Sequence, residues 1–452
     1  MGGFLESFVY LLFTFDPNPQ EMNRKSRRDF IKSSGAVALG AAILPTTNLS
    51  GQSEQVTAKT LKVGLVGCGG RGTGAAVQAV NADPNAELVA MGDIFKDRLD
   101  NSYMSLQQEV PDKLKVDDRH KYVGFDAYKK VIDAVDVVLL TTPPCFRPDH
   151  LKAAIAAGKH AFCEKPVAVD APGVRKVIEA AKEAESKKLS ILSGFCYRYD
   201  NSNRAIFERI HRGDIGEIRS LTTFRFGGEL WSKPRETGWT DMEYQLRNWL
   251  YYDWLSGDFI TEQSVHSLDL MAWAMGDKTP IRAIGNGGRQ KRADPVYGNI
   301  YDHFAIEFEY EDGVRASHFT RQMAGCRNRN TVDVFGSDGQ AQLQMGRNLS
   351  ITGKNAWQFR GDKNNMYQTE HDEFFAAIRS GQPKNDGFWM ANSSMLAVLG
   401  RMVAYSGQEI TWEEAINSDI KLGPDINDYD WDLKWKGSDV AIPGITKASL
   451  IY

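Results

Sequence analysis

Several protein classes are excluded by what the sequence lacks. Its 452 residues include only five cysteines, at positions Cys68, Cys145, Cys163, Cys196 and Cys326. They form no C-x-x-C pair and have no zinc-like spacing, which argues against a disulfide framework and against a zinc site. Apart from Glu262 and His266, no group of His, Cys, Asp and Glu has metal-ligand spacing, so we predict that no metal is bound.

Strong charge of one sign is also missing. The formal net charge is only −4, with 54 basic and 58 acidic side chains. Such a chain has no electrostatic reason to bind nucleic acid or an anionic membrane. We therefore predict no nucleic-acid partner, and a neutral substrate fits this composition better.

Near the N-terminus the chain has no apolar run long enough to cross a bilayer. The weakly apolar run at 35–44 is half the length of about 20 residues that a spanning helix needs. It follows "SRRDFIK", in which Arg27 and Arg28 are adjacent, a pattern typical of a twin-arginine export signal. A basic patch in a disordered tail is the alternative. We expect residues 1–52 to be an export signal and leader, with Met22 as an alternative start, and the protein to be periplasmic or exported through the twin-arginine machinery.

The remaining chain of about 400 residues is too long for one core. Apolar runs at 61–67, 86–93, 135–141, 159–165 and 188–194 alternate with helical patterns such as those at 150–158 and 171–188. This alternation predicts an α/β domain at 60–194 with a doubly wound parallel sheet, the Rossmann arrangement.

After residue 195 the pattern changes to strands of period two. Phe304, Ile306, Phe308 and Tyr310 alternate with other residues up to the turn at 311–313, which predicts a hairpin with one buried face. Further strands are expected at 330–336 and 340–344, and helices at 370–381 and 393–407. We predict a second, α+β domain at 195–412 with a largely antiparallel open sheet, and a tail at 413–452 that wraps the surface. Since open sheets frequently pair between subunits, a homodimer or homotetramer is expected.

A dinucleotide site is predicted where the first strand ends. Gly67, Gly69 and Gly72 form G-x-G-x-x-G between a strand and a helix, which lets backbone amides approach a pyrophosphate. Asp93 ends the next strand, 21 residues after Gly72, where a carboxylate accepts from a ribose 2′-hydroxyl. The Asp93 carboxylate favours NAD as the cofactor. Because Lys96 is nearby in the sequence, NADP is the alternative. Because a dinucleotide is made in the cytoplasm, export in the folded state suggests a cofactor that is bound before export and held tightly.

Beyond this fingerprint, "TTPP" (141–144), "HLKAAIAAGKHAFCEKP" (150–166), "GFCYRYD" (194–200) and "GDFITEQSVHSLDLMAWAMG" (257–276) resemble the Gfo/Idh/MocA family, which includes glucose-fructose oxidoreductase and inositol dehydrogenase. The resemblance covers most of the chain from 61 to about 410. It implies a two-domain dehydrogenase that acts on sugars or polyols. The cofactor-binding residues that we predict on these grounds are Gly67, Gly69, Gly70, Arg71, Gly72, Asp93, Thr142, Pro143, His150, Glu164 and Lys165.

Three residues are candidates for catalysis. Lys165 precedes a proline, which holds it extended at the carboxyl end of a strand, and the resemblance places this position in the active site. His266 is the candidate base, because an imidazole titrates near operating pH. Glu262 replaces the aspartate that family members often carry, and four residues of spacing put it on the same helical face as His266. A core histidine and a surface salt bridge are the respective alternatives for His266 and Lys165.

Substrate contacts are expected from aromatic residues at 247–257, of which Trp249 and Tyr252 are the candidates, because aromatic faces stack on sugar rings. Core or interface aromatics are the alternative. The resemblance alone adds Arg198 and Tyr199.

The expected function is that of an exported NAD(P)-dependent oxidoreductase acting on a secondary hydroxyl of a sugar, glycoside or polyol. The alternative is an NAD-dependent glycosidase that oxidises the ring transiently; such enzymes tend to lose the lysine that is present here. A non-catalytic NAD-bound sensor would be expected to lack both the lysine and the histidine.

Overall fold

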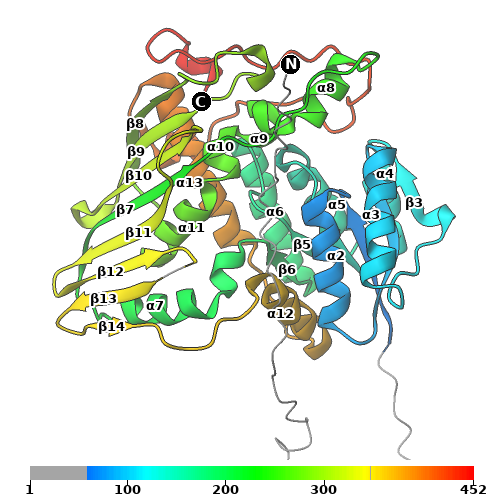
Figure 1. Cartoon of the computed structure of the whole chain (residues 1–452), viewed down its shortest axis with the longest axis horizontal. Helices are drawn as coiled ribbons and strands as arrows, with labels where there is room; N and C mark the ends of the chain where they lie inside the picture. The colour runs from blue at the N-terminus through cyan, green and yellow to red at the C-terminus, as the bar shows by residue number, and fades with distance from the viewer. Residues whose placement is uncertain (1–58, 347) are drawn as a thin grey trace, which may run out of the picture. The chain divides into compact units, whose positions relative to one another are not determined.

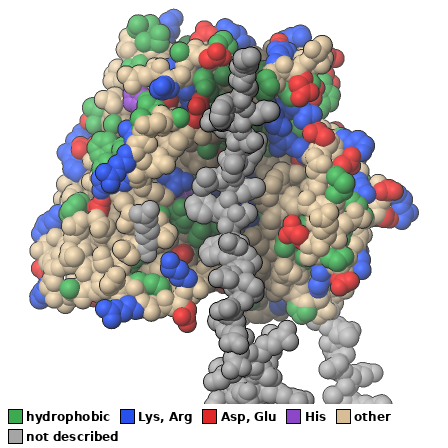
Figure 2. Space-filling view, viewed as in Figure 1, with side chains coloured by type: hydrophobic (Ala, Val, Ile, Leu, Met, Phe, Trp, Pro, Cys, Tyr) green, Lys and Arg blue, Asp and Glu red, His purple; other side chains and the backbone are tan. Residues whose placement is uncertain are grey.

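The computed structural model describes residues 59–346 and 348–452. The predicted export signal therefore lies outside the described residues. Within the described residues, no helix has both the length and the apolar character needed to cross a membrane. On the face drawn in Figure 2, acidic and basic side chains are interspersed, in keeping with the small net charge.

A six-stranded parallel sheet forms the N-terminal half, in the order β3-β2-β1-β4-β5-β6. Its strands are β1 (Leu61–Val66), β2 (Ala86–Asp93), β3 (Lys121–Val123), β4 (Val137–Leu140), β5 (His160–Cys163) and β6 (Ile191–Ser193). The helices are α2 (Gly70–Ala82), α3 (Lys96–Glu109), α4 (Ala127–Ala134), α5 (Arg147–Ala156) and α6 (Ala171–Lys187). The strand order reverses between β1 and β4, which confirms the predicted doubly wound sheet and places a ligand crevice at their carboxyl ends.

A nine-stranded mixed sheet forms the second half, in the order β14-β13-β12-β11-β7-β10-β9-β8-β15. Its strands are β7 (Ile218–Gly227), β8 (Arg282–Gly288), β9 (His303–Glu309), β10 (Arg315–Gln322), β11 (Arg329–Gly336), β12 (Gly339–Gln344), β13 (Leu349–Gly353), β14 (Trp357–Gln358) and β15 (Ile410–Thr411). The predicted hairpin is the antiparallel pair of β9 and β10. Only β7 and β10 run parallel, so the sheet is mostly antiparallel, as predicted.

The second half also contributes α7 (Asn201–His211), α8 (Asp241–Arg247), α9 (Asp253–Ser256), α10 (Asp258–Glu262), α11 (Val265–Ala274), α12 (Met366–Ser380), α13 (Gly387–Ser406) and α14 (Trp412–Ile416). Helices α11 and α13 lie on the inner face of the mixed sheet, between it and the parallel sheet (Figure 1). Phe304, Ile306 and Phe308, which alternate along β9, are buried against this layer. Period-two alternation thus decides which face of the sheet is covered.

Helix α12 follows β14 in sequence but packs against α2 of the parallel sheet. Its Phe374 and Phe375 are buried in the core of that sheet. As a result, residues from the end of the chain reach the glycine loop that precedes α2.

Candidate active site

A cavity of about 390 Å³ lies where β1 enters α2. Nine of the predicted cofactor residues line it: Gly67, Gly69, Gly70, Arg71, Gly72, Asp93, Thr142, Pro143 and His150. Two of the glycines are required by close packing. A Cβ on Gly72 would lie 2.0 Å from the Gly67 carbonyl oxygen, and one on Gly67, whose φ is +97°, would lie 2.7 Å from the Thr142 nitrogen. The loop is therefore a cradle of bare backbone, which fits a dinucleotide pyrophosphate.

Asp93 is held at one end of this cavity. Its carboxylate accepts hydrogen bonds from the Cys68 nitrogen at 2.6 Å and from the Phe95 nitrogen at 2.8 Å. Burial raises the pKa of Asp93, and these two amide bonds oppose that rise. Because each carboxylate oxygen has a second lone pair, Asp93 can still accept a ribose hydroxyl.

The sequence interpretation missed several residues of the cavity wall: Ile94, Phe95, Arg98, Phe125, Phe146, Trp231 and Leu246. Phe95 and Arg98 follow Asp93 directly, and that position after a nucleotide-binding strand was a usable signal. Trp249 also lines the cavity, so this predicted substrate residue lies at the cofactor site.

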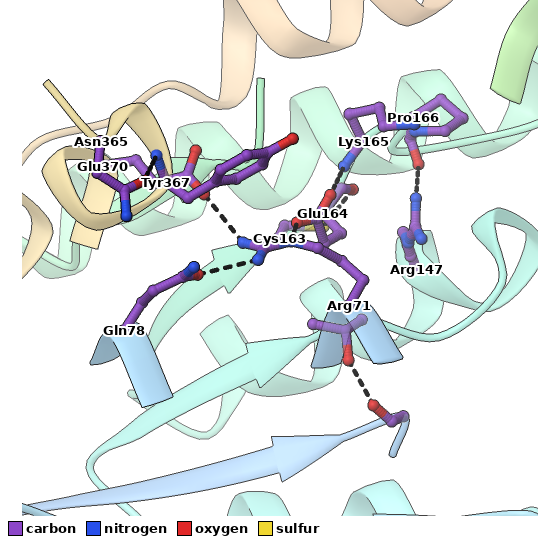
Figure 3. A network of polar contacts seen from close by, with 12 residues as sticks. Arg71, Gln78, Arg147, Cys163, Glu164, Lys165, Pro166, Asn365, Tyr367 and Glu370 are labelled. Carbon is purple, nitrogen blue, oxygen red and sulfur yellow. Dashed lines mark hydrogen bonds and ion pairs between the residues drawn. The ribbon is translucent and has the colours of Figure 1, made fainter. Parts of the chain in front are cut away.

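Arg71 connects the glycine loop to two distant carboxylates (Figure 3). Its Nε donates to Glu164, its Nη2 donates to Glu370 of α12 at 3.0 Å, and its Nη1 donates to Gln78 at 2.9 Å. All three guanidinium nitrogens are engaged by the protein, so Arg71 shapes the cavity chiefly by anchoring. Burial raises the pKa of Glu370 well above its ordinary value, and the charge of Arg71 opposes that rise.

Glu164 in turn fixes the start of the next motif. Its carboxylate accepts from the Lys165 backbone nitrogen at 3.1 Å, and only 4% of the residue is exposed. Neither Glu164 nor Lys165 is part of the wall of the cavity described above, although both were predicted to bind the cofactor. Their connection to it runs through Arg71.

The side chain of Lys165 meets the second half of the chain. Its Nζ lies 2.8 Å from the Glu262 carbonyl oxygen and 3.2 Å from the Glu262 carboxylate. The two side chains are 13% and 10% exposed, so this is no ordinary surface ion pair. The other Glu262 oxygen accepts from the Gln263 amide at 2.6 Å.

His266 lies beyond a break in the helix. Helix α10 ends at Glu262 and α11 begins at Val265, so the expectation of one continuous helix carrying Glu262 and His266 is wrong. Ser264 lies in the break, and its hydroxyl pairs with the Thr320 hydroxyl of β10 at 2.6 Å. That contact holds the break against the sheet.

The imidazole of His266 is kept neutral. Burial lowers its pKa well below 6.5, and the charges of Lys165 and Arg225 lower it further. Its Nδ1 has no hydrogen-bond partner among the described residues. Its ring lies 4.9 Å from that of Tyr197. A neutral imidazole can accept a proton, although burial and the neighbouring ammonium both oppose its protonation.

Three predicted substrate residues contact other parts of the protein or lie away from the cavity. Arg198 pairs with Asp269 at 2.8 Å and with Asp277, and it stacks over the ring of Trp389. The Tyr199 hydroxyl donates to Asp386 at 2.5 Å, and the residue is 2% exposed. Tyr252 lies at a different surface hollow, beside Tyr244 and Trp435. Arg198 and Tyr199, which the resemblance suggested, are thus engaged by other side chains of the protein, and Tyr252, which the aromatic segment suggested, lies outside the cavity described above. No group of three or more His, Cys, Asp or Glu in the described ranges could hold a metal.

Two segments of the chain match domains of one family. Residues 61–191 match the oxidoreductase family with an NAD-binding Rossmann fold, and residues 203–342 match the GFO/IDH/MocA C-terminal domain. The glycines of the fingerprint and Asp93 lie in the first segment. Three residues of the cavity wall, Trp231, Leu246 and Trp249, lie in the second segment, as do Glu262 and His266.

Relatives and solved structures agree with this match. Inositol 2-dehydrogenase of Serratia proteamaculans (strain 568) is 29% identical over 343 residues, covering 73% of this chain and 89% of that protein. The inositol 2-dehydrogenase of Rhizobium meliloti (strain 1021) is 25% identical over 333 residues, covering 71% and 90%. An aldose-aldose oxidoreductase from Caulobacter crescentus, complexed with glycerol, shares the fold with a TM-score of 0.62, at 18% identity, covering 78% of this chain and all of that one. Myo-inositol 2-dehydrogenase from Lactobacillus plantarum gives a TM-score of 0.60 at 21% identity, covering 78% and 99%.

Proposed function

Since the chain belongs to the Gfo/Idh/MocA family of NAD(P)-dependent oxidoreductases acting on CH–OH groups, we propose that it transfers a hydride between a secondary hydroxyl carbon of a sugar, glycoside or polyol and a tightly held nicotinamide cofactor. The observation that carries the proposal is the contact of the Lys165 ammonium with Glu262, at 2.8 Å from its carbonyl oxygen and 3.2 Å from its carboxylate, four residues before His266. We propose that this ammonium from one half of the chain and the imidazole from the other act on the same substrate hydroxyl.

The residues divide the work as follows. The glycine loop and Asp93 hold the dinucleotide, which supplies the hydride acceptor. His266 takes the hydroxyl proton of the substrate, because its pKa keeps it neutral at physiological pH. Lys165 donates a hydrogen bond to the same oxygen and stabilises the developing alkoxide.

Glu262 has two tasks in this scheme. Its carboxylate neutralises Lys165 before substrate binds, and its contacts with Lys165 and Gln263 fix the position of the ammonium. With that charge balanced, the proton-transfer region suits an uncharged polyol. The inositol dehydrogenases among the relatives support polyols as the first substrates to test.

A retained cofactor has to be restored in place. In the first half-reaction His266 would take the hydroxyl proton and the substrate would leave as a ketone, its hydride passing to the dinucleotide that the glycine loop and Asp93 would hold. In the second half-reaction a different carbonyl compound would receive that hydride and a proton from His266, and would leave as an alcohol.

The second candidate is redox-neutral glycoside cleavage. The lysine that such enzymes tend to lose is present here as Lys165 and is ordered by Glu262, which favours net oxidation. Incubating the protein with polyols and with aryl glycosides separates the two. Reduction of the cofactor, measured as an increase in near-ultraviolet absorbance, supports the oxidoreductase. Release of the aryl group without net reduction supports the glycosidase. If neither signal appears, both candidate functions are contradicted.

Export and assembly remain part of the proposal. The Arg27–Arg28 pair motivates twin-arginine export. Lysine at both positions should abolish periplasmic accumulation, and unchanged accumulation contradicts export by this route.

The outer face of the mixed sheet carries the exposed Ile284 and Phe335, which suits pairing between subunits. Light scattering is expected to give a dimer or tetramer mass, and a monomer mass overturns the assembly.

A further inference from the structure

The C-terminal tail contains a short segment of strict alternation, residues 429–435, which we call the strap. Tyr429, Trp431, Leu433 and Trp435 are partly buried, whereas the acidic and basic residues between them are exposed. Such alternation gives an extended segment one apolar face and one solvated face. The strap forms no strand of either sheet, so its alternation needs another explanation.

Its apolar face is directed at the cofactor cavity. The Trp431 ring lies 5.5 Å from that of Phe95 and 4.8 Å from that of Phe125. The Tyr429 ring lies 5.6 Å from Phe125 and 4.9 Å from Phe146. All three phenylalanines line the cavity. The strap therefore forms an outer layer behind the aromatic wall.

This wall is at the adenosine end of the site. Phe95 follows Asp93 by two residues, and its backbone nitrogen donates to the Asp93 carboxylate. The wall cannot swing outward unless the ring contacts with Tyr429 and Trp431 break. A nucleotide bound against it is retained for as long as the strap stays in place.

The strap is fixed on both sides. Upstream, the Leu422 nitrogen donates to Asp170 at 3.0 Å. At the last residue of the strap, the Trp435 carbonyl accepts from Gln245 of α8 at 2.7 Å. Figure 1 shows the C-terminal segment, in red, lying beside α8. Both anchors are elements of the folded core, so the strap has little freedom to lift as a unit.

We propose that Tyr429 and Trp431 are positioning residues of the cofactor site, which slow nucleotide release by holding Phe95, Phe125 and Phe146 in place. This inference rests on the proposed function in that a retained cofactor is what the strap provides. The competing explanation is that the strap only covers apolar surface. That explanation predicts equal effects from every strap aromatic.

A matched pair of tryptophans separates these explanations. Trp435 belongs to the same strap, but its ring faces Trp254 at 6.3 Å, and Trp254 is not part of the cavity wall. Full-chain protein loaded with NAD is freed of unbound nucleotide and mixed with excess NADH, and exchange is followed by nicotinamide fluorescence. The melting temperature of each nucleotide-free variant reports the purely structural effect.

The expected result is at least about tenfold faster exchange for Trp431→Ala, since two aromatic pairs are lost. Trp435→Ala should exchange nucleotide at a rate within about twofold of the parent. Its melting temperature should nevertheless fall by about as much as that of Trp431→Ala. Trp431→Phe, which keeps an aromatic ring, should exchange at close to the parental rate. If Trp431→Ala does not fold, Trp431→Leu replaces it with the same expected direction.

Two outcomes overturn the inference: parental exchange in Trp431→Ala, or equal acceleration in both alanine variants. The readout needs only nucleotide binding. A failure of the proposed function, seen as absence of polyol oxidation by the parent, would leave the exchange ratio measurable and is thus distinguishable.

Discussion

Replacing Gly72 by alanine tests the cofactor cradle against a control in the same helix. The new Cβ would lie 2.0 Å from the Gly67 carbonyl oxygen and 2.5 Å from the Thr141 hydroxyl oxygen, and that hydroxyl already donates to the same carbonyl. Ordinary carbon contacts are wider by more than an ångström, so α2 has to move away from the loop. Overpacking of this kind costs about 1–3 kcal/mol.

The same displacement separates the backbone amides that are to face the pyrophosphate. If the whole cost is taken from cofactor binding, affinity falls about 5- to 150-fold at 1.4 kcal/mol per decade. Gly74→Ala is the matched control, because its Cβ would meet only the Arg71 guanidinium at 3.5 Å. A helix-interior alanine should stabilise by up to about 1 kcal/mol. Calorimetric titration with NAD and urea unfolding measure both effects. Parental NAD affinity in Gly72→Ala would refute the placement of the pyrophosphate at this loop.

Three further predictions concern the catalytic region. Lys165→Met should lower kcat by about 100- to 10,000-fold with folding retained, whereas Lys152→Met, at an exposed ion pair, should leave kcat unchanged in the same assay. Because burial and the Lys165 charge hold the pKa of His266 well below 6.5, the imidazole stays neutral as pH falls to 6.5, and kcat/KM should decline only at lower pH; an acid limb centred at pH 6.5 or above would contradict this. Arg198→Met removes the cation beside buried Asp269, so urea unfolding should show a loss of about 3–5 kcal/mol, while a raised KM without loss of stability would restore the substrate role.

Local pattern was sufficient for much of the fold. The boundaries of β2 and the antiparallel pair of β9 and β10 agree with the expected strands, because burial on one or both faces leaves a direct record in the order of apolar residues. The glycine fingerprint and Asp93 were found for a similar reason. Their spacing is set by one strand-loop-helix unit and the strand that follows it.

Contacts between distant segments left no such record. Glu164 and Glu370 are separated from Arg71 by 93 and 299 residues, and their meeting depends on how α12 returns to α2. The break between α10 and α11 depends on a hydroxyl pair between Ser264 and Thr320. Neither is visible in periodicity, since both arise from packing of the completed sheets.

The role of Arg198 was ambiguous in the sequence for a different reason. Arginine at such a position serves equally well as a substrate contact or as an interior ion-pair partner, and only its surroundings decide between these roles. Here Asp269 and Asp277 occupy the guanidinium. Trp249 shows the same ambiguity, because an aromatic face suits a nucleotide wall as well as a sugar ring.

If the cofactor is retained, the protonation state of the His266 imidazole affects both half-reactions. In the oxidising half-reaction a neutral imidazole must be present to take the hydroxyl proton, and the depressed pKa provides it. In the reducing half-reaction the same group must return a proton, and a low pKa makes the imidazolium a strong acid. Burial and the neighbouring Lys165 therefore favour the return of the proton over its uptake, so the oxidising direction depends on Lys165 to stabilise the alkoxide. A site that released its cofactor after each oxidation would need only the first of these properties.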